Sequence, residues 1–239
     1  MKLYVNPRYQ HLREWLEHID EHFAGDSPVP GRGAVLVRTV QVDGLTLTVK
    51  RFGAPGMAGK IAQRTFRTPK AKKAYVKPFL MRERGFETPE PIAFVRYHRG
   101  LLRGDDTYYV ALKSDFRYTL DRLGELPQDQ QQDVIRAFAR FTANLHEQGF
   151  LHHNFTSQNI LFDQRRERWH FQLIDTHCMR CGRSVGLKKG CQNFCRLEGD
   201  EDFFRTLALH YAEARHAGPA QVTELIIRAR KKYLLQTLS

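Results

Sequence analysis

Hydrophobic positions near the N-terminus recur with the period of a helix. Apolar side chains spaced by three or four residues predict one short amphipathic helix over residues 10–23; they are Leu12, Trp15, Leu16, Ile19 and Phe23. The acidic residues on its other side favour packing on its own domain over contact with acidic lipid. The segment Gly25 to Gly33 follows with two prolines and is predicted to be a loop.

After this loop the hydrophobic pattern has period two, as in a strand. Ala34–Val42 and Leu45–Phe52 are predicted strands, joined at Asp43-Gly44, which is a tight hairpin signal. Leu and Val alternate with Thr and Lys in the second strand, so one face belongs to a core and the other is polar. Two further strands are expected near Ile92–Tyr97 and Thr107–Leu112.

The remaining periodic segments are helical. Thr68-Pro69 is a helix start, and that helix is expected to run to about Arg84 and to stop at Gly85. A second helix spans Gln128 to Gln148 and ends at Gly149, and two more are expected over residues 200–216 and 219–236. The order predicts an α+β protein with two lobes. Residues 1–112 form a sheet-rich N-terminal lobe with a leading helix and one long helix, and residues 113–239 form a helical C-terminal lobe.

Composition and charge narrow the class of protein. With 41% hydrophobic and 27% charged residues the chain is typical of a soluble globular protein. No run approaches the ~20 apolar residues of a membrane span, and the N-terminus has no secretory signal pattern. A cytoplasmic protein is expected.

The net charge of +12 is concentrated between Lys50 and Arg103. This stretch contains fourteen Lys and Arg but only three Glu. Such an excess of positive charge favours an anionic partner such as a phosphosugar, nucleic acid or acidic lipid surface. A solvated face that only increases solubility remains the alternative. The nucleic-acid interpretation rests on charge alone, because no basic motif interleaved with aromatic residues occurs.

Residues 151–162 and 172–175 follow the spacing of a catalytic motif. The first segment reads LHHNFTSQNILF and the second QLID. The spacing is that of a kinase catalytic loop followed by a metal-binding aspartate. His152 takes the histidine position, Asn159 and Asp175 take the two positions that hold metal, and Asn154 stands where the catalytic base would be.

The chain resembles the lipopolysaccharide core kinases of Gram-negative bacteria, the Kdo/heptose kinase family, over most of its length. The resemblance rests on five segments: VDGLTLTVKRF (42–52), TPEPIAF (88–94), TYYVALKSDFRYTL (107–120), FARFTANLHEQGFLHHNFTSQNILF (138–162) and LIDTHCMR (173–180). It implies a bilobal protein-kinase-like fold and ATP-dependent phosphorylation of a sugar hydroxyl of the lipopolysaccharide inner core. The partner would be an anionic glycolipid met by the basic stretch, at the inner face of the inner membrane.

The resemblance also implies roles for individual residues. Lys50 would pair with the α- and β-phosphates of ATP, although an ordinary strand lysine with a solvated tip is the alternative. Asn159 and Asp175 would hold Mg²⁺. No APE-like segment follows Asp175, which favours a sugar or small-molecule acceptor over a protein.

Several positions depart from the kinase pattern and favour an alternative, a pseudokinase with a binding or regulatory role. Asn154 can orient a hydroxyl but cannot take its proton, which leaves His152 or His153 as substitute bases. Three further departures concern the N-terminal lobe. Val76 stands at the position of the helix glutamate, and Glu83 lies about 10 Å further along the helix axis. Pro78 lies inside the helix, where a proline kinks the helix or costs ~3 kcal/mol of stability. Gly31-Arg32-Gly33 is a weak candidate for a phosphate-binding loop.

Four cysteines lie close together after Asp175. They are Cys178, Cys181, Cys191 and Cys195. Buried thiols are the leading interpretation. A structural Zn²⁺ site with His177 as a spare ligand is the alternative, and a disulfide is the least expected because the cytosol keeps thiols reduced.

Overall fold

A computed structural model describes residues 1–23, 35–52, 68–98 and 105–237. The chain divides into two compact units. We call Met1–Glu83 with Thr88–Ser114 the N-terminal unit, and Arg84–Glu87 with Asp115–Ser239 the C-terminal unit.

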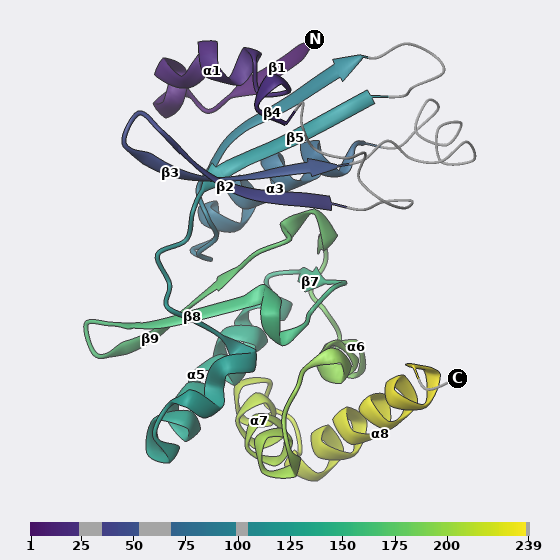
Figure 1. Ribbon diagram of the computed structural model, residues 1–239. Coiled ribbons are helices and arrows are strands. Elements are labelled where there is room, and N and C mark those ends of the chain that lie inside the picture. The colour runs from purple at the N-terminus through teal and green to yellow at the C-terminus, as the bar shows by residue number, and fades with distance from the viewer. Residues whose placement is uncertain (24–34, 53–67, 99–104, 238–239) are drawn as a thin grey trace. The chain divides into compact units, whose positions relative to one another are not determined.

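An antiparallel five-stranded sheet forms the frame of the N-terminal unit (Figure 1). Its strand order is β1-β4-β5-β3-β2. The bounds are β1 Lys2–Val5, β2 Val35–Val42, β3 Leu45–Phe52, β4 Pro91–His98 and β5 Asp105–Leu112. The predicted hairpin of β2 and β3 is confirmed: Asp43 and Gly44 both have positive φ, 47° and 75°, as a two-residue type I′ turn requires.

Helical segments cover both faces of this sheet (Figure 1). On one face lies the N-terminal segment, made of η1 Pro7–Leu12, α1 Arg13–Glu17 and η2 Glu21–Phe23. Its Leu12 and Leu16 share a core with Leu47 and Val49 of β3. On the other face α3, Lys70–Glu83, packs Ala71 and Ala74 against the sheet.

The single helix expected over residues 10–23 is instead three short helical pieces. The ring of His18 donates from Nδ1 to the carbonyl of Glu14 at 2.9 Å. Its backbone N–H donates to Trp15 instead, at 3.3 Å. The His18 side chain therefore occupies the Glu14 carbonyl, which the His18 backbone N–H would have to bond for the α-helix to continue. The apolar spacing still places these residues in the core.

Helix α3 continues through Pro78, where we expected a kink or a destabilising cost. Pro78 belongs to the buried side of the helix, with Ala71, Ala74 and Met81. Two of these four side chains are alanines, so this side of the helix is narrow and fits close to the sheet.

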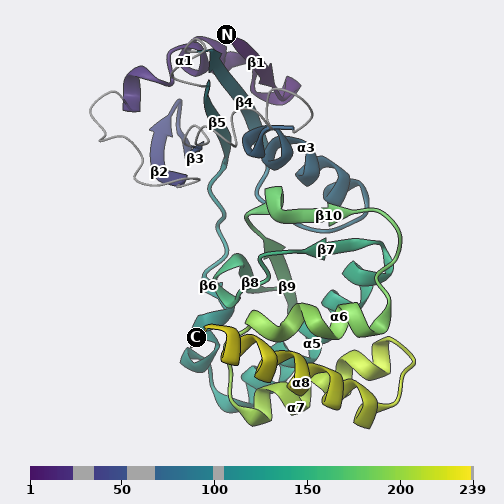
Figure 2. The ribbon, with the colours of Figure 1, turned by 90° about the vertical axis from the view of Figure 1, so that its right-hand side faces the viewer.

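The C-terminal unit combines short strands with helices. The strands are β6 Tyr118–Thr119, β7 Phe150–His152, β8 Ile160–Arg165, β9 Arg168–Leu173 and β10 Met179–Cys181. They form one sheet in the order β6-β8-β9 and a separate β7–β10 pair, side by side in Figure 2.

The helices of the C-terminal unit confirm the sequence pattern and add one short helix. They are α5 Gln128–Glu147, α6 Leu187–Asn193, α7 Glu201–Ala214 and α8 Pro219–Thr237, with short η3 Leu120–Glu125, η4 Ser157–Asn159, η5 Thr176–Cys178 and η6 Phe194–Arg196. α6 was not predicted. Phe138 of α5 contacts Phe155, Phe171 and Phe194 in the centre of the unit. No helix within the described ranges is long and apolar enough to cross a membrane.

Candidate active site

Lys50 lies on the α3 side of the N-terminal sheet. Side chains alternate along a strand, and Phe52, two residues on, packs with Ala71 and Ala74 of α3. In register, Lys50 stands between Val37 of β2 and Tyr109 of β5. The sheet therefore holds its ammonium group on a defined face, as a phosphate-binding lysine requires.

The position expected for the helix glutamate is apolar and open. Val76 is 41% exposed and does not belong to the buried side of α3. Glu83 is the last residue of the helix. The Gly31-Arg32-Gly33 candidate lies outside the described residues.

His152 closes strand β7 and is fully buried. Its Nδ1 accepts the backbone N–H of Asn154 at 3.2 Å, and its Nε2–H donates to the carbonyl of Ile174 at 2.9 Å. Burial lowers the pKa of His152, so the ring stays neutral. Both ring nitrogens are used in hydrogen bonds to the backbone, so His152 ties the loop to the segment before Asp175.

Asn154 is held by an arginine that the sequence pattern did not reveal. Arg196 donates from Nη1 to Asn154 Oδ1 at 2.9 Å. Because a guanidinium only donates, the carboxamide must present its oxygen to Arg196 and its NH₂ elsewhere. The guanidinium also lies 5.6 Å from the ring centroid of Tyr233 on α8. Arg196 and Asn154 are 42 residues apart, and no pattern in the sequence indicates that they are in contact.

The strand register brings Asn159 and Asp175 together. Ile160 pairs with Leu173 at the end of the β8–β9 hairpin, and the N–H of Ile174 donates to the carbonyl of Asn159 at 3.1 Å. Asn159 thus precedes one strand and Asp175 follows the other. Asn159 donates from Nδ2 to the carbonyl of Asn154 at 2.9 Å, which directs its Oδ1 the other way.

Asp175 has a left-handed backbone, with φ 55° and ψ 35°. This conformation is uncommon outside glycine, although aspartate tolerates it better than most residues, and such positions cluster at functional sites. One carboxylate and one amide oxygen fit Mg²⁺, which takes few protein ligands when phosphates and water supply the rest.

A chain of hydrogen bonds links the catalytic loop to the helices of the C-terminal unit. Arg215 donates to the hydroxyl of Tyr211 at 2.7 Å, and that hydroxyl donates to His146 Nδ1 at 2.8 Å. His146 Nε2–H then donates to Asn193 Oδ1 at 3.1 Å, and Asn193 Nδ2 donates to the carbonyl of His152 at 2.9 Å. Each donor fixes the next acceptor, so the loop is tied to three helices. This network was not predicted from the sequence.

The cysteines do not form the grouping that a tetrahedral zinc site requires. In the described part of the chain, which includes all four, no three His, Cys, Asp or Glu side chains could hold a metal ion together. Cys178 and Cys181 lie along η5 and β10, whereas Cys191 is buried on α6. Burial raises the pKa of the Cys191 thiol to about 11. The described residues therefore give the zinc hypothesis no support: the four cysteines lie on different elements, and no disulfide joins them.

Comparisons with known proteins identify a family and a fold. The sequence model of the lipopolysaccharide kinase (Kdo/WaaP) family matches residues 56–206. Among solved structures, WaaP in complex with acyl carrier protein aligns with a TM-score of 0.60 and 15% identity, over 97% of this chain and 99% of that one. An ADP-bound aminoglycoside phosphotransferase aligns with a TM-score of 0.46 and 12% identity, over 90% and 85%. No curated protein matches in sequence.

The structural likeness to WaaP establishes a protein-kinase-like fold, as expected. The family match covers more than half of the chain, begins just after Lys50 and contains Asn154, Asn159 and Asp175. The catalytic loop described above therefore lies in the region that defines the family. On that match, the chain belongs to the lipopolysaccharide kinase (Kdo/WaaP) family.

Proposed function

We propose that this protein transfers the γ-phosphoryl group of ATP to a hydroxyl of a lipopolysaccharide inner-core sugar. Family membership makes it a kinase that acts on such sugars. The observation that carries the proposal is the meeting of Asn159 and Asp175 at the end of the β8–β9 hairpin, beside Asn154.

Three residues would bind the nucleotide and its metal ion. In residues 1–112, Lys50 of β3 would contact the α- and β-phosphates. In residues 113–239, Asn159 Oδ1 and the Asp175 carboxylate would hold Mg²⁺, which would bridge the phosphates and neutralise developing charge. Two oxygen ligands on fixed backbone support this assignment.

Asn154 would position the acceptor without acting as a base. Its NH₂ group, turned away from Arg196, can donate to the oxygen of a sugar hydroxyl. Phosphoryl transfer passes through a loose transition state that depends mainly on positioning and charge stabilisation. A hydroxyl held in line by Asn154 therefore does not need a carboxylate to remove its proton first.

Family membership and the positive charge between Lys50 and Arg103 support a proposal for the acceptor and for where the protein meets it. The substrate is proposed to be the anionic core glycolipid at the cytoplasmic face of the inner membrane. The excess of Lys and Arg between Lys50 and Arg103 supports this proposal, because an electropositive surface attracts phosphorylated sugars.

The test is transfer of labelled γ-phosphate from ATP to purified core glycolipid in the presence of Mg²⁺. Asp175→Ala should reduce transfer at least ~100-fold, since it removes the one charged metal ligand. Asp133→Ala is the matched control, because Asp133 is exposed on α5 and pairs only with Arg136 in the described contacts. Equal transfer by the Asp175→Ala and natural proteins, or none by the natural protein, would overturn the proposal.

A further inference from the structure

The C-terminal half of α8 exposes apolar side chains to an unusual degree. Of its 19 residues, only Val222 and Ile226 are buried. Ile227, Leu234 and Leu235 are 40%, 43% and 62% exposed. A helix that exposes three large aliphatic side chains between its middle and its C-terminal end is typical of a docking surface.

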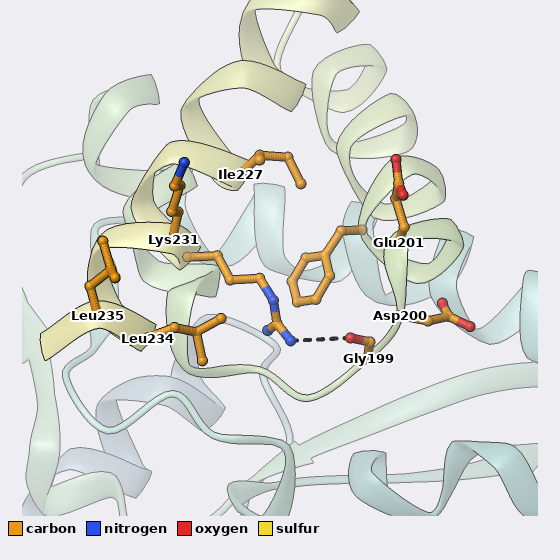
Figure 3. Close-up of a pocket in the computed structure, with 9 residues that line it drawn as sticks. Gly199, Asp200, Glu201, Ile227, Lys231, Leu234 and Leu235 are labelled. Carbon is orange, nitrogen blue, oxygen red and sulfur yellow. Dashed lines mark hydrogen bonds between the residues drawn. The ribbon is translucent and has the colours of Figure 1, made fainter. Parts of the chain in front are cut away.

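These side chains border an open groove between α8 and the start of α7 (Figure 3). The groove has a volume of about 370 Å³, and Phe204 of α7 forms its far wall. The guanidinium of Arg230 lies 4.1 Å from the Phe204 ring centroid and donates to the Gly199 carbonyl at 3.1 Å, so this cation is used internally.

Positive charge accompanies the apolar side chains. Between Leu225 and Thr237 the sequence has four cations and no Asp or Glu. At about 100° per residue, Ile227, Lys231, Leu234 and Leu235 fall within about 100° of one another. Exposed Arg228 and Lys232 lie beside that strip, both on the side of Leu235. We call these six residues the α8 surface.

The acidic residues at the groove are already compensated. Asp200 accepts the backbone N–H of Phe203 at 2.8 Å and caps α7. Glu201 pairs with Arg205 one turn along. The α8 surface is therefore apolar and mainly positive. Glu224, one turn before Arg228, is the one acidic residue on the same helix.

We propose that the α8 surface docks the protein on an anionic lipid bilayer. Aliphatic side chains would enter the boundary between head groups and acyl chains, and Arg228, Lys231 and Lys232 would meet lipid phosphates. A second copy is a poorer occupant, because a two-fold interface would bring these cations against themselves. The inference rests on the proposed location at a membrane and names the surface that meets it.

The experiment is sedimentation of the whole protein with vesicles, without nucleotide. Vesicles of phosphatidylcholine with about one third phosphatidylglycerol should bind the protein, those of phosphatidylcholine alone should bind it weakly, and salt should weaken binding. The variant Leu234→Ser with Leu235→Ser should lose at least ~10-fold in affinity. Lys231→Gln with Lys232→Gln should lose about 30-fold. Leu209→Ser on α7 is the matched control, since Leu209 is also 42% exposed and lies outside the groove.

Three outcomes would overturn the inference: equal binding to both vesicles, unchanged binding by the α8 variants, or capture of an acidic protein without vesicle binding. Failure of the kinase proposal is distinguishable from these. Asp175→Ala should bind vesicles normally, and the Leu234→Ser, Leu235→Ser variant should phosphorylate a soluble, deacylated core oligosaccharide at the natural rate.

Discussion

At residue scale, the hydrogen bond between Arg196 and Asn154 decides what the catalytic loop can do. With its oxygen held at 2.9 Å, Asn154 offers only N–H groups to a substrate. A carboxylate at this position would instead form a charge-assisted bond with Arg196, which favours the charged form and weakens it as a base.

Asn154→Asp should raise phosphoryl transfer by about tenfold, below the 10²–10⁴-fold that general-base catalysis typically supplies. Arg196 would pair with the new carboxylate and limit the gain. A pH profile of kcat should show an acidic limb in the variant that the natural protein lacks. Equal rates in both proteins would mean that positioning and Mg²⁺ suffice.

Arg196→Met should lower kcat by about tenfold while leaving KM for ATP unchanged, because it frees Asn154 to rotate without touching the nucleotide ligands. Arg196→Lys keeps a donor and should restore part of the rate. A parallel rise in KM for ATP, or no rescue by lysine, would indicate a general structural defect instead.

At the scale of elements, His146 joins α5 to α6 and α7 in one buried network. Burial lowers its pKa to about 4, so the folded protein keeps the ring neutral. The unfolded chain binds a proton below about pH 6.5. Stability is therefore complete above that pH and is lost as the pH falls from 6.5 towards 4.

Between pH 7 and pH 5, His146 should cost the natural protein about 2 kcal/mol of unfolding free energy. Urea titrations at both pH values measure this loss. His146→Gln should remove most of it, although the variant starts from a lower stability. His11→Gln, at an exposed position, should leave the pH dependence unchanged. An equal decline in His146→Gln would assign the acid sensitivity to other groups.

At the scale of the whole molecule, the proposed function predicts that nucleotide and Mg²⁺ stabilise the folded protein. ATP with Mg²⁺ should raise the melting temperature. Lys50→Ala and Asp175→Ala should each abolish that rise, and the double variant should lose no more. Exposed Lys113→Ala serves as the control. Additive, independent losses would show that the two residues do not share one ligand.

Local patterns were enough for most of the long helices and strands. Period-two and period-3.6 spacing located β2, β3, α5, α7 and α8, and turn chemistry located the Asp43-Gly44 hairpin. Motif spacing predicted His152, Asn154, Asn159 and Asp175 as site residues, because a strand, a turn and a returning strand lie within about two dozen residues. Each of these features depends on residues that are close together in sequence, so local spacing is enough to predict it.

Only the tertiary structure revealed what holds those residues. Arg196 reaches Asn154 across 42 positions, and Tyr211 reaches His146 across 65. The four cysteines, adjacent in sequence, separate because β10 and α6 place them on different elements. The sequence determined the elements and the chemistry, whereas partners distant in sequence depend on the path of the folded chain, which no local spacing encodes.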